Sequence, residues 1–314
     1  MNSYVLVLGV SVYDIFGFTN NNYRSKDSNP GRVRVSFGGV TRNIAENMAR
    51  IGINTKYITV VGDDEKGKSL LSDAKNKQID VENSLVIEGG STPTYMAILD
   101  ERGELQSAIV DMVIADKMSK EFIESKSEII ENAEYMVLDV DNPENLEYIL
   151  TRYAGKTKFV VDSISASKVY KVRHLIKNLH TFKPNRYEAE ILCGFEIKTR
   201  DDVRKAGKHF RDLGIENVFI SLDADGIYYN NGEEEGLIRA DGIRVVNVTG
   251  AGDSCVSGLV YSFMKHLNIK DTVKFAIAMS AITIAHEQTI HPDMSLELVE
   301  QYLNELDWFE IKFK

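Results

Sequence analysis

The sequence predicts a doubly wound α/β fold: a mostly parallel sheet with helices on both faces, and a small additional β-sheet. Three observations support this prediction. Short apolar runs rich in Val and Ile alternate with stretches of helical periodicity, the 314 residues exceed one small domain, and two β-rich segments interrupt the alternation. Strand–helix–strand units of this kind join parallel neighbouring strands. We therefore expect a single α/β unit over residues 1–314.

Apolar runs mark the strands of the main sheet, because strands that are buried on both faces read as continuous hydrophobic segments. They are, in order, Val5–Val10, Tyr57–Val61, Tyr135–Val140, Phe159–Asp162 and Val218–Leu222. Apolar residues at spacings of three and four predict the helices that connect and follow these strands. The helices are Thr41–Ile51, Lys68–Gln78, Ser119–Asn132, Asn145–Tyr153, Asp201–Leu213, Ser254–Leu267 and Asp271–Glu287.

Two segments without helical periodicity, residues 11–36 and 92–112, predict the additional sheet. The first contains the alternation Arg32-Val33-Arg34-Val35. In the second, two alternating runs flank Glu101-Arg102-Gly103-Glu104, as in a β-hairpin. A sheet this small cannot form a core of its own. We expect it to close over the main unit as a lid or to pair with a second copy in a homodimer.

The composition favours a globular cytoplasmic protein and argues against nucleic-acid and membrane partners. The net charge of −10 and the pI near 5.2 leave no surplus of Lys and Arg for a polyphosphate backbone. The longest nearly apolar stretch, Phe275–Ala285, is too short to span a bilayer. We expect no signal peptide, because the first residues lack a basic flank. The two cysteines, Cys193 and Cys255, cannot form a disulfide framework.

The segment Thr249-Gly250-Ala251-Gly252-Asp253 carries the strongest chemical signal, because a glycine-flanked turn leads there into a helix. The backbone N–H groups of Gly250, Ala251 and Gly252, together with the helix dipole, suit an anion such as phosphate. An acid at the mouth of such a site has a purpose if it accepts the proton of a hydroxyl group that attacks the phosphate. Asp253 is therefore either a general base or a helix cap, and the residues alone favour neither.

A second glycine-led helix follows Gly38-Gly39 and carries Asn43, whose side chain offers a donor and an acceptor to a polyhydroxylated ligand. Asp14 follows the first predicted strand, at the end where open α/β sheets bind ligands. We expect Asp14, Gly38, Gly39 and Asn43 to contact a substrate. The alternative is a plain turn with Thr41 as the helix cap.

With both glycine-led segments in this order and at this separation, the chain resembles the PfkB, or ribokinase-like, family of carbohydrate and nucleoside kinases over nearly its whole length. The resemblance implies ATP as the phosphate donor and Asp253 as the general base. Lys183-Pro184-Asn185-Arg186-Tyr187-Glu188 also resembles the family's Pro-Asn-x-x-Glu segment. This likeness implies that Asn185 and Glu188 lie near the phosphates and hold Mg²⁺ through water. The alternative is a strand exit with a helix cap.

Within the family, softer motifs resemble the pseudouridine kinase subgroup. They are Gly39-Val40-x-Arg42-Asn43-Ile44-Ala45-Glu46-Asn47, Asp111-Met112-x-Ile114, Asp162-x-x-Ser165-x-x-Lys168 and Thr289-x-x-Pro292-x-x-Ser295. This likeness implies phosphorylation of the ribose 5′-hydroxyl of a C-nucleoside. Ribose, a fructose-like sugar or another nucleoside such as uridine ranks behind it. Asp111, Asp141 and Lys168 are weaker candidates for base or ribose contacts, with polar loop residues and a solvated lysine as the alternative.

Two positions depart from the family pattern. The segment from Ser221 to Gly226 resembles the nucleotide-binding segment, so we expect Ser221, Asp223 and Gly226 near ATP, but Asp223 stands where glycine is usual. The negative charge of Asp223 would change the affinity for ATP or the preference among nucleotides. Asn247 stands where ribokinase-type members carry an Asp that binds a monovalent cation. Activation by K⁺ is therefore left open.

Other functions were weighed against this one. Residues 62–69 match the P-loop pattern, but Asp63, Asp64 and Glu65 fill the loop that should cradle phosphates. His286 and His291 resemble a zinc pair, yet five residues of helix rotate the rings apart by about 140°, so we propose no zinc site. The competing class is a non-catalytic sensor that binds a sugar or nucleoside without transfer, motivated by Asp223. Formation of ADP distinguishes the two classes.

Overall fold

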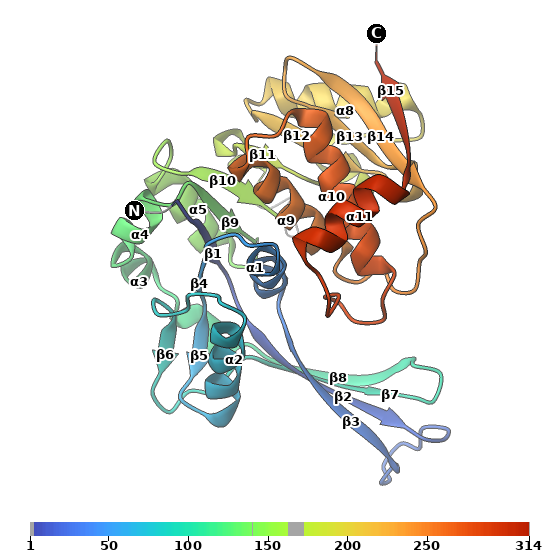
Figure 1. Cartoon of the computed structure of the whole chain (residues 1–314). Helices are drawn as coiled ribbons and strands as arrows, with labels where there is room; N and C mark the ends of the chain where they lie inside the picture. The colour runs from blue at the N-terminus through green and yellow to red at the C-terminus, as the bar shows by residue number, and fades with distance from the viewer. Residues whose placement is uncertain (1–2, 140, 163–172, 314) are drawn as a thin grey trace.

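The computed structural model describes residues 3–139, 141–162 and 173–313. In this part of the chain, a nine-stranded sheet forms the centre of the molecule, in the order β15-β14-β13-β12-β11-β10-β9-β1-β4 (Figure 1). Its strands are β1 (Val5–Leu8), β4 (Thr55–Ile58), β9 (Tyr135–Leu138), β10 (Lys158–Val161), β11 (Thr181–Phe182), β12 (Asn217–Ser221), β13 (Ile227–Asn230), β14 (Glu235–Asp241) and β15 (Asp307–Lys312). The six strands β12, β11, β10, β9, β1 and β4 are parallel, and β13, β14 and β15 add an antiparallel edge. The predicted α/β class is confirmed.

Helices cover both faces of this sheet, as Figure 1 shows. One face packs against α1 (Val40–Arg50), α9 (Ala251–Met264), α10 (Ile269–Ile284) and α11 (Leu296–Glu305). The other face packs against α3 (Lys120–Glu124), α4 (Ser127–Glu131), α5 (Pro143–Arg152), α7 (Arg186–Cys193) and α8 (Arg200–Asp212). The sequence of β1 is continuously apolar because both faces of the strand are buried. Leu6 points into one core cluster, whereas Val5 and Val7 point into the other.

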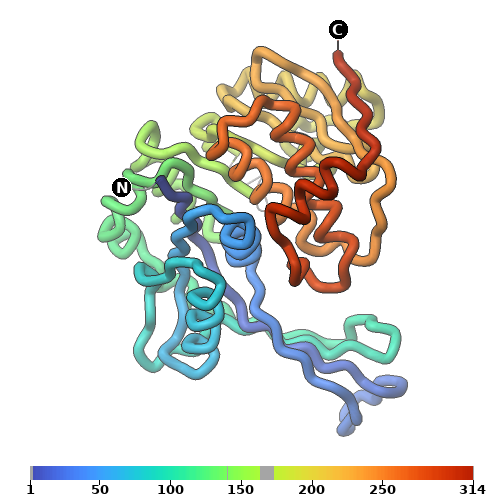
Figure 2. The backbone as a smooth tube through the Cα atoms, viewed as in Figure 1, coloured from blue at the N-terminus to red at the C-terminus, as the bar shows by residue number. Residues whose placement is uncertain are grey.

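A separate four-stranded sheet extends away from the main body, which Figures 1 and 2 show at the lower right. Its order is β3-β2-β7-β8, and it consists of β2 (Val12–Thr19), β3 (Gly31–Gly38), β7 (Thr94–Leu99) and β8 (Leu105–Asp111). Strands β7 and β8 pair antiparallel, so the hairpin expected around Glu101–Glu104 is confirmed. The two short strands β5 (Val60–Gly62) and β6 (Leu85–Ile87) pair beside α2 (Glu65–Asn76).

Several predicted boundaries were wrong for local reasons. The strand expected over Tyr57–Val61 is split between β4 and β5, which belong to different sheets. The helix expected over Ser119–Asn132 is two short helices, α3 with Ser119 as its side-chain N-cap and α4, which begins after Lys126. The last predicted helix ends at Ile284 rather than at Glu287. None of the described helices has the length and hydropathy needed to cross a membrane.

Candidate active site

Helix α9 begins at the carboxyl end of the parallel strands, and no described side chain caps its N-terminus. Its N-cap is Gly250, which has a left-handed backbone at φ +84° and makes no side-chain cap hydrogen bond. A Cβ on Gly250 would overlap the carbonyl oxygen of Thr289, so only glycine fits this turn. The first turn of a helix leaves backbone N–H groups without intrahelical partners, and the helix dipole adds positive potential there. This end of α9 therefore suits an anion.

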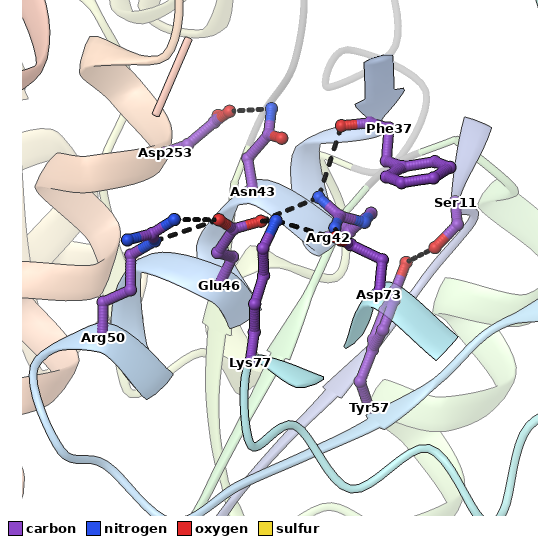
Figure 3. Close-up of polar contacts among 10 residues, drawn as sticks. All are labelled: Ser11, Phe37, Arg42, Asn43, Glu46, Arg50, Tyr57, Asp73, Lys77 and Asp253. Atoms are coloured by element: carbon purple, nitrogen blue, oxygen red, sulfur yellow. Dashed lines mark hydrogen bonds and ion pairs between the residues drawn. The ribbon is translucent and has the colours of Figure 1, made fainter. Parts of the chain in front are cut away.

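Asp253 is the third residue of α9 and is only 9% exposed. One of its carboxylate oxygens accepts a hydrogen bond of 2.8 Å from the Nδ2 of Asn43 on α1, as Figure 3 shows. Burial, and next the charge of Asp162, raise the pKa of Asp253 to about 7, against the opposing effects of Asn43 and Lys183. Because Gly250 occupies the cap position, the alternative that Asp253 caps the helix is wrong.

The Gly38-Gly39 pair allows β2 and α1 to approach each other. A Cβ on Gly38 would overlap the carboxylate of Asp14 on β2, and one on Gly39 would overlap the backbone carbonyl of Val10. Burial raises the pKa of Asp14 to about 6, although the charge of Arg42 opposes this. The start of α1 is thus bordered by Asp14 on one side and, through Asn43, by Asp253 on the other.

The alternative in which Thr41 caps α1 is wrong. The N-cap is Gly39, without a side-chain cap hydrogen bond, and the Thr41 hydroxyl lies 3.2 Å from the Tyr57 hydroxyl instead. Both residues are buried. Thr41 therefore joins α1 to the sheet rather than closing the end of the helix.

A buried ionic network fixes the opposite side of α1 (Figure 3). Arg42, which is 1% exposed, donates to Glu46 at 3.0 Å, to the carbonyl oxygen of Phe37 at 3.3 Å and to Asp73 on α2. Lys77 and Arg50 also contact Glu46, at 2.8 and 2.9 Å. Burial acts to raise the pKa of Glu46, but the three cations Arg42, Lys77 and Arg50 hold this pKa below its usual value. The network connects the small sheet, α1 and α2.

Asn185 and Glu188 form a reciprocal capping box at the start of α7. The Asn185 side chain accepts a hydrogen bond of 2.9 Å from the Glu188 N–H, and the Glu188 carboxylate accepts one of 2.8 Å from the Asn185 N–H. The helix-cap alternative therefore describes their geometry. Asn185 also bridges to Ser221 at the end of β12, so the structure brings these two predicted site residues together.

Two charged residues that the sequence reasoning did not assign to the site lie beside Asp253. Lys183 follows β11, Asp162 follows β10, and both side chains are buried. A Cβ on Gly252 would lie 3.8 Å from the Lys183 Nζ and 4.0 Å from an Asp162 Oδ atom. The available signal was their position, since each is a charged residue directly after a buried parallel strand.

The predicted nucleotide segment follows β12 as the short 3₁₀ helix η3 (Asp223–Asp225) and ends at Gly226. Asp223 has a left-handed backbone at φ +53°, which is a conformation that favours glycine. Asp225 pairs with Arg186 of α7 at 2.7 Å, so this segment is tied to the helix that begins at Asn185.

Of the weaker candidates, Asp141 lies at a cavity of about 390 Å³ at the carboxyl ends of β1 and β9. Asp141 lines this cavity together with Gly9, Val10, Met112 and Asp139. Asp111 ends β8, and its carboxylate accepts a hydrogen bond of 3.3 Å from the Val113 N–H. Lys168 lies outside the described residues.

The P-loop-like segment does not form a phosphate cradle. Asp64 is the N-cap of α2, and its carboxylate accepts hydrogen bonds from the N–H groups of Gly67 at 2.8 Å and Thr92 at 3.0 Å. Lys68 is exposed and pairs with Glu65 at 2.7 Å. Carboxylates thus occupy backbone amides that a P-loop would offer to phosphate.

The helix expected between His286 and His291 is wrong, because residues 286–291 are not helical. The rings of His286 and His291 lie 4.8 Å apart between centroids. Each Nδ1 accepts a backbone hydrogen bond, from Gln288 at 3.0 Å and from Asp293 at 3.1 Å.

Comparisons with known proteins show similarity over nearly the whole chain. The chain is 35% identical over 295 residues to the pseudouridine kinase of Escherichia coli, covering 93% of this chain and 94% of that protein. A solved candidate sugar kinase from Clostridium perfringens is 56% identical, with a TM-score of 0.96 and coverage of 100% of this chain and 99% of that one. A ribokinase structure from Thermotoga maritima shares the fold, with a TM-score of 0.82, 22% identity and coverage of 97% and 100%.

Residues 2–295 match the model of the pfkB family of carbohydrate kinases. The match spans the glycine-led start of α1, the Asn185–Glu188 box and the start of α9. The chain therefore belongs to the pfkB family of carbohydrate kinases, which are phosphotransferases with an alcohol group as acceptor.

Proposed function

We propose that this kinase transfers the terminal phosphoryl group of ATP to the 5′-hydroxyl of a nucleoside, with pseudouridine as the substrate. One observation carries the proposal: the buried Asp253 carboxylate lies at the open end of α9 and is hydrogen-bonded to Asn43 of α1. A base is thereby held between an anion-binding helix end and the residues expected to bind the acceptor. The similarity to the pseudouridine kinase of Escherichia coli supports the choice of acceptor.

The ribose hydroxyls would be held by Asp14, Gly38, Gly39 and Asn43. These residues border the start of α1, where Asp14 and Asn43 provide acceptors and a donor for a polyhydroxylated ring. Asp111, Asp141 and Lys168 are further candidates for base or ribose contacts. The small sheet would act as a lid that excludes water and so limits hydrolysis of ATP.

In the proposed reaction, Asp253 accepts the proton of the attacking hydroxyl as the oxygen bonds to phosphorus. A base whose pKa is about 7 is matched to this task near neutral pH. The N–H groups at the start of α9, from Gly250 and Gly252, would stabilise charge on the moving phosphoryl group, and the Ala251 N–H would join them by giving up its hydrogen bond of 3.3 Å to the Val248 carbonyl oxygen. Ser221, Asp223 and Gly226 would border the nucleotide.

Asn185 and Glu188 are the residues that would hold Mg²⁺, through water. An amide oxygen and a carboxylate are the hard oxygen donors that Mg²⁺ prefers, and the capping box fixes both side chains in place. When bound, the ion would neutralise charge on the nucleotide phosphates.

We further propose that turnover does not require K⁺. The Nδ2 of Asn247 donates a hydrogen bond of 3.0 Å to the Glu287 carbonyl oxygen, and its Oδ1 accepts one of 3.0 Å from the Thr249 N–H. An amide joins these two backbone segments directly, whereas a carboxylate at this position would need a cation between its oxygens and the carbonyl.

We also propose a homodimer formed through the small sheet. Because side chains alternate along a strand, the face opposite Asp14 carries the cross-strand row Val35, Ile15, Met96 and Ile109. Val35, Met96 and Ile109 of this row are exposed. An exposed apolar sheet face of this kind is typical of a protein interface, and a second copy would cover it.

We infer a cytoplasmic location for the reaction. The supporting features are the unpaired thiols of Cys193 and Cys255, which suit a reducing compartment, and the use of ATP that the family implies.

The test is release of ADP from Mg-ATP with pseudouridine, uridine, adenosine, ribose and fructose as acceptors. We expect turnover with pseudouridine, and we expect Asp253→Asn to lower kcat about 100-fold or more with acceptor binding retained. Asp212→Asn, at the exposed end of α8, is the matched control and should equal the wild type.

Three other outcomes are informative. Turnover with a different acceptor would keep the kinase and replace the substrate. Full turnover by Asp253→Asn would refute the role of Asp253. Binding of one compound without any ADP would favour a non-catalytic sensor, the alternative that Asp223 motivates.

A further inference from the structure

Lys183 is a buried cation beside the residues of the proposed reaction, and none of the steps described above uses it. It directly follows β11, at the carboxyl end of the parallel strands, and is 6% exposed. Its Nζ lies 3.8 Å from the point where a Cβ on Gly252 would be. Gly252 is the second residue of α9, so the ammonium group faces the first turn of the helix that carries Asp253. A full positive charge is therefore present at the open end of α9.

The surroundings of Lys183 keep this charge in place. Asp162 first, and also Glu188 and Asp253, are acidic groups whose charges attract the Lys183 ammonium group, and the thiol of Cys255 lies among them. Together with Lys183, these groups come from the ends of β10 and β11 and from α7 and α9. The cluster holds a fixed ammonium group amid carboxylates, in a site that must also accept phosphate oxygens.

The position of the ammonium group matches the place where negative charge develops during transfer. Charge spreads over the outer oxygens of the moving phosphoryl group as the bond to the leaving oxygen breaks. The end of a helix supplies only about half of an elementary positive charge, which is partial compensation. A preorganised cation in a water-poor site stabilises such charge without reorganisation. Lys183 is the described cation that the structure places against the first turn of α9.

We propose that Lys183 is a further catalytic residue, whose ammonium group binds the outer oxygens of the phosphoryl group during transfer. This inference rests on the proposed kinase reaction at the same site. The acceptor oxygen forms a bond to phosphorus, and the bond from phosphorus to the bridging oxygen breaks. ADP leaves with the electron pair, and the acceptor proton goes to Asp253. Lys183 keeps its own protons throughout and acts by charge and hydrogen bonding.

A second consequence concerns the base. The positive charge of Lys183 lowers the pKa of Asp253, against burial and Asp162, which raise it to about 7. Loss of the Lys183 charge should therefore raise the pKa of Asp253 and move the acid limb of kcat/KM to higher pH. This shift reports only the charge of Lys183 near Asp253, so binding of the aluminium fluoride complex is the readout that separates a catalytic lysine from a structural one.

The experiment compares Lys183→Met and Lys183→Gln with the wild type, using whichever acceptor the wild type phosphorylates. We expect kcat to fall by about 100-fold or more, as for loss of a preorganised donor at a transition state, while the acceptor KM stays within about threefold. Binding of ADP with Mg²⁺ and aluminium fluoride, which mimics the moving phosphoryl group, should weaken. Binding of ADP alone should not.

Lys158→Met is the matched control. Lys158 starts β10 at the opposite end of the sheet, is exposed and stacks on Tyr135. It should keep the wild-type kcat, pH profile and aluminium fluoride binding. If a neutral Lys183 variant matches the wild type in all three readouts while it keeps the wild-type melting curve, the inference is overturned.

Removal of the Lys183 charge can impair folding, because a positive charge is lost beside the buried carboxylate of Asp162. The double variant Lys183→Met/Asp162→Asn neutralises both groups and keeps the test open. It is expected to fold and still to lack efficient transfer, and recovery of wild-type turnover would overturn the proposal. If the wild type turns over no acceptor, the proposed function itself fails, and this inference fails with it.

Discussion

Asp223 shows at the scale of one residue how a departure from a family pattern has two separable costs. Its left-handed backbone at φ +53° is strained for a residue with a Cβ, and its carboxylate lies in the segment proposed to border the nucleotide. We expect Asp223→Gly to lower the KM for ATP severalfold and to raise the free energy of unfolding by about 1 kcal/mol. ADP release and denaturant unfolding measure the two effects.

Gln78→Gly separates backbone strain from charge. Gln78 also has a positive φ of +62°, but it is neutral and lies just after α2. Its replacement should stabilise the protein by a similar amount and leave the KM for ATP unchanged. An Asp223→Gly variant with an unaltered or higher KM for ATP would show that this carboxylate does not oppose nucleotide binding.

Single residues differed in how much the sequence revealed about them. Asp253 and Asn43 each stand beside glycines that open a helix, and that local pattern brought both into consideration before the structure joined them by a hydrogen bond. Lys183 and Asp162 have no such flanking signal, and their meeting depends on β10 and β11 being neighbours in the sheet. Contacts made by strand order cannot be read from a local motif.

At the scale of elements, the loop that contains Asn247 carries a prediction about cations. Its amide bridges the Thr249 N–H and the Glu287 carbonyl, so replacement of K⁺ by N-methylglucamine should change kcat by less than about twofold. Asn247→Asp should lose activity without K⁺ and regain it with K⁺, because two oxygens would then face each other across the loop. Steady-state ADP release in the two salts measures both effects.

The wild type provides the decisive comparison for this loop. A wild-type kcat that collapses without K⁺ would mean that the amide hydrogen bond does not replace a cation. An Asn247→Asp variant that is indifferent to K⁺ would mean that the loop does not form a cation site even with a carboxylate.

Elements with strong periodicity were predictable, and elements defined by tertiary contacts were not. Helices α1, α5, α8, α9 and α10 lie within a few residues of their predicted ranges. The edge strand β15 is largely exposed, so it lacks the apolar run that marks a buried strand. The division between β4 and β5 at Thr59 could not be predicted from the β-rich run of residues 57–61, because it reflects which sheet each half joins.

At the scale of the whole molecule, the exposed face of the small sheet predicts a dimer. Light scattering should give twice the 35.3 kDa mass of the chain. Ile109→Asp puts a charge at the edge-strand end of the exposed apolar row and should yield monomers, because burial of an unpaired carboxylate in an interface is costly. Val86→Asp, on the exposed side of β6, should remain dimeric. A monomeric wild type would contradict the proposal.

Stability should reveal the cost of burying the base. The unfolded chain holds the Asp253 carboxyl at its ordinary pKa of 3.8, whereas the folded protein raises this pKa to about 7. Folded protein thus binds this proton more tightly, so the stability it contributes is present below pH 3.8 and is lost as pH rises through 7. Asp253→Asn removes the titration and should stabilise the protein at pH 8 by up to about 4 kcal/mol relative to acidic pH.

Other buried groups titrate over the same range, so the difference between the two proteins is the informative quantity. Burial raises the pKa of Asp14 to about 6 and lowers the pKa of His180 to about 4, and these shifts have opposite effects on stability. Both groups are retained in Asp253→Asn, and their contributions cancel when the variant's free energy of unfolding is subtracted from the wild type's at each pH. A difference that stays constant through neutral pH would show that Asp253 is already ionised well below pH 7 in the folded protein, and it would remove the reason to regard this carboxylate as a base matched to neutral pH.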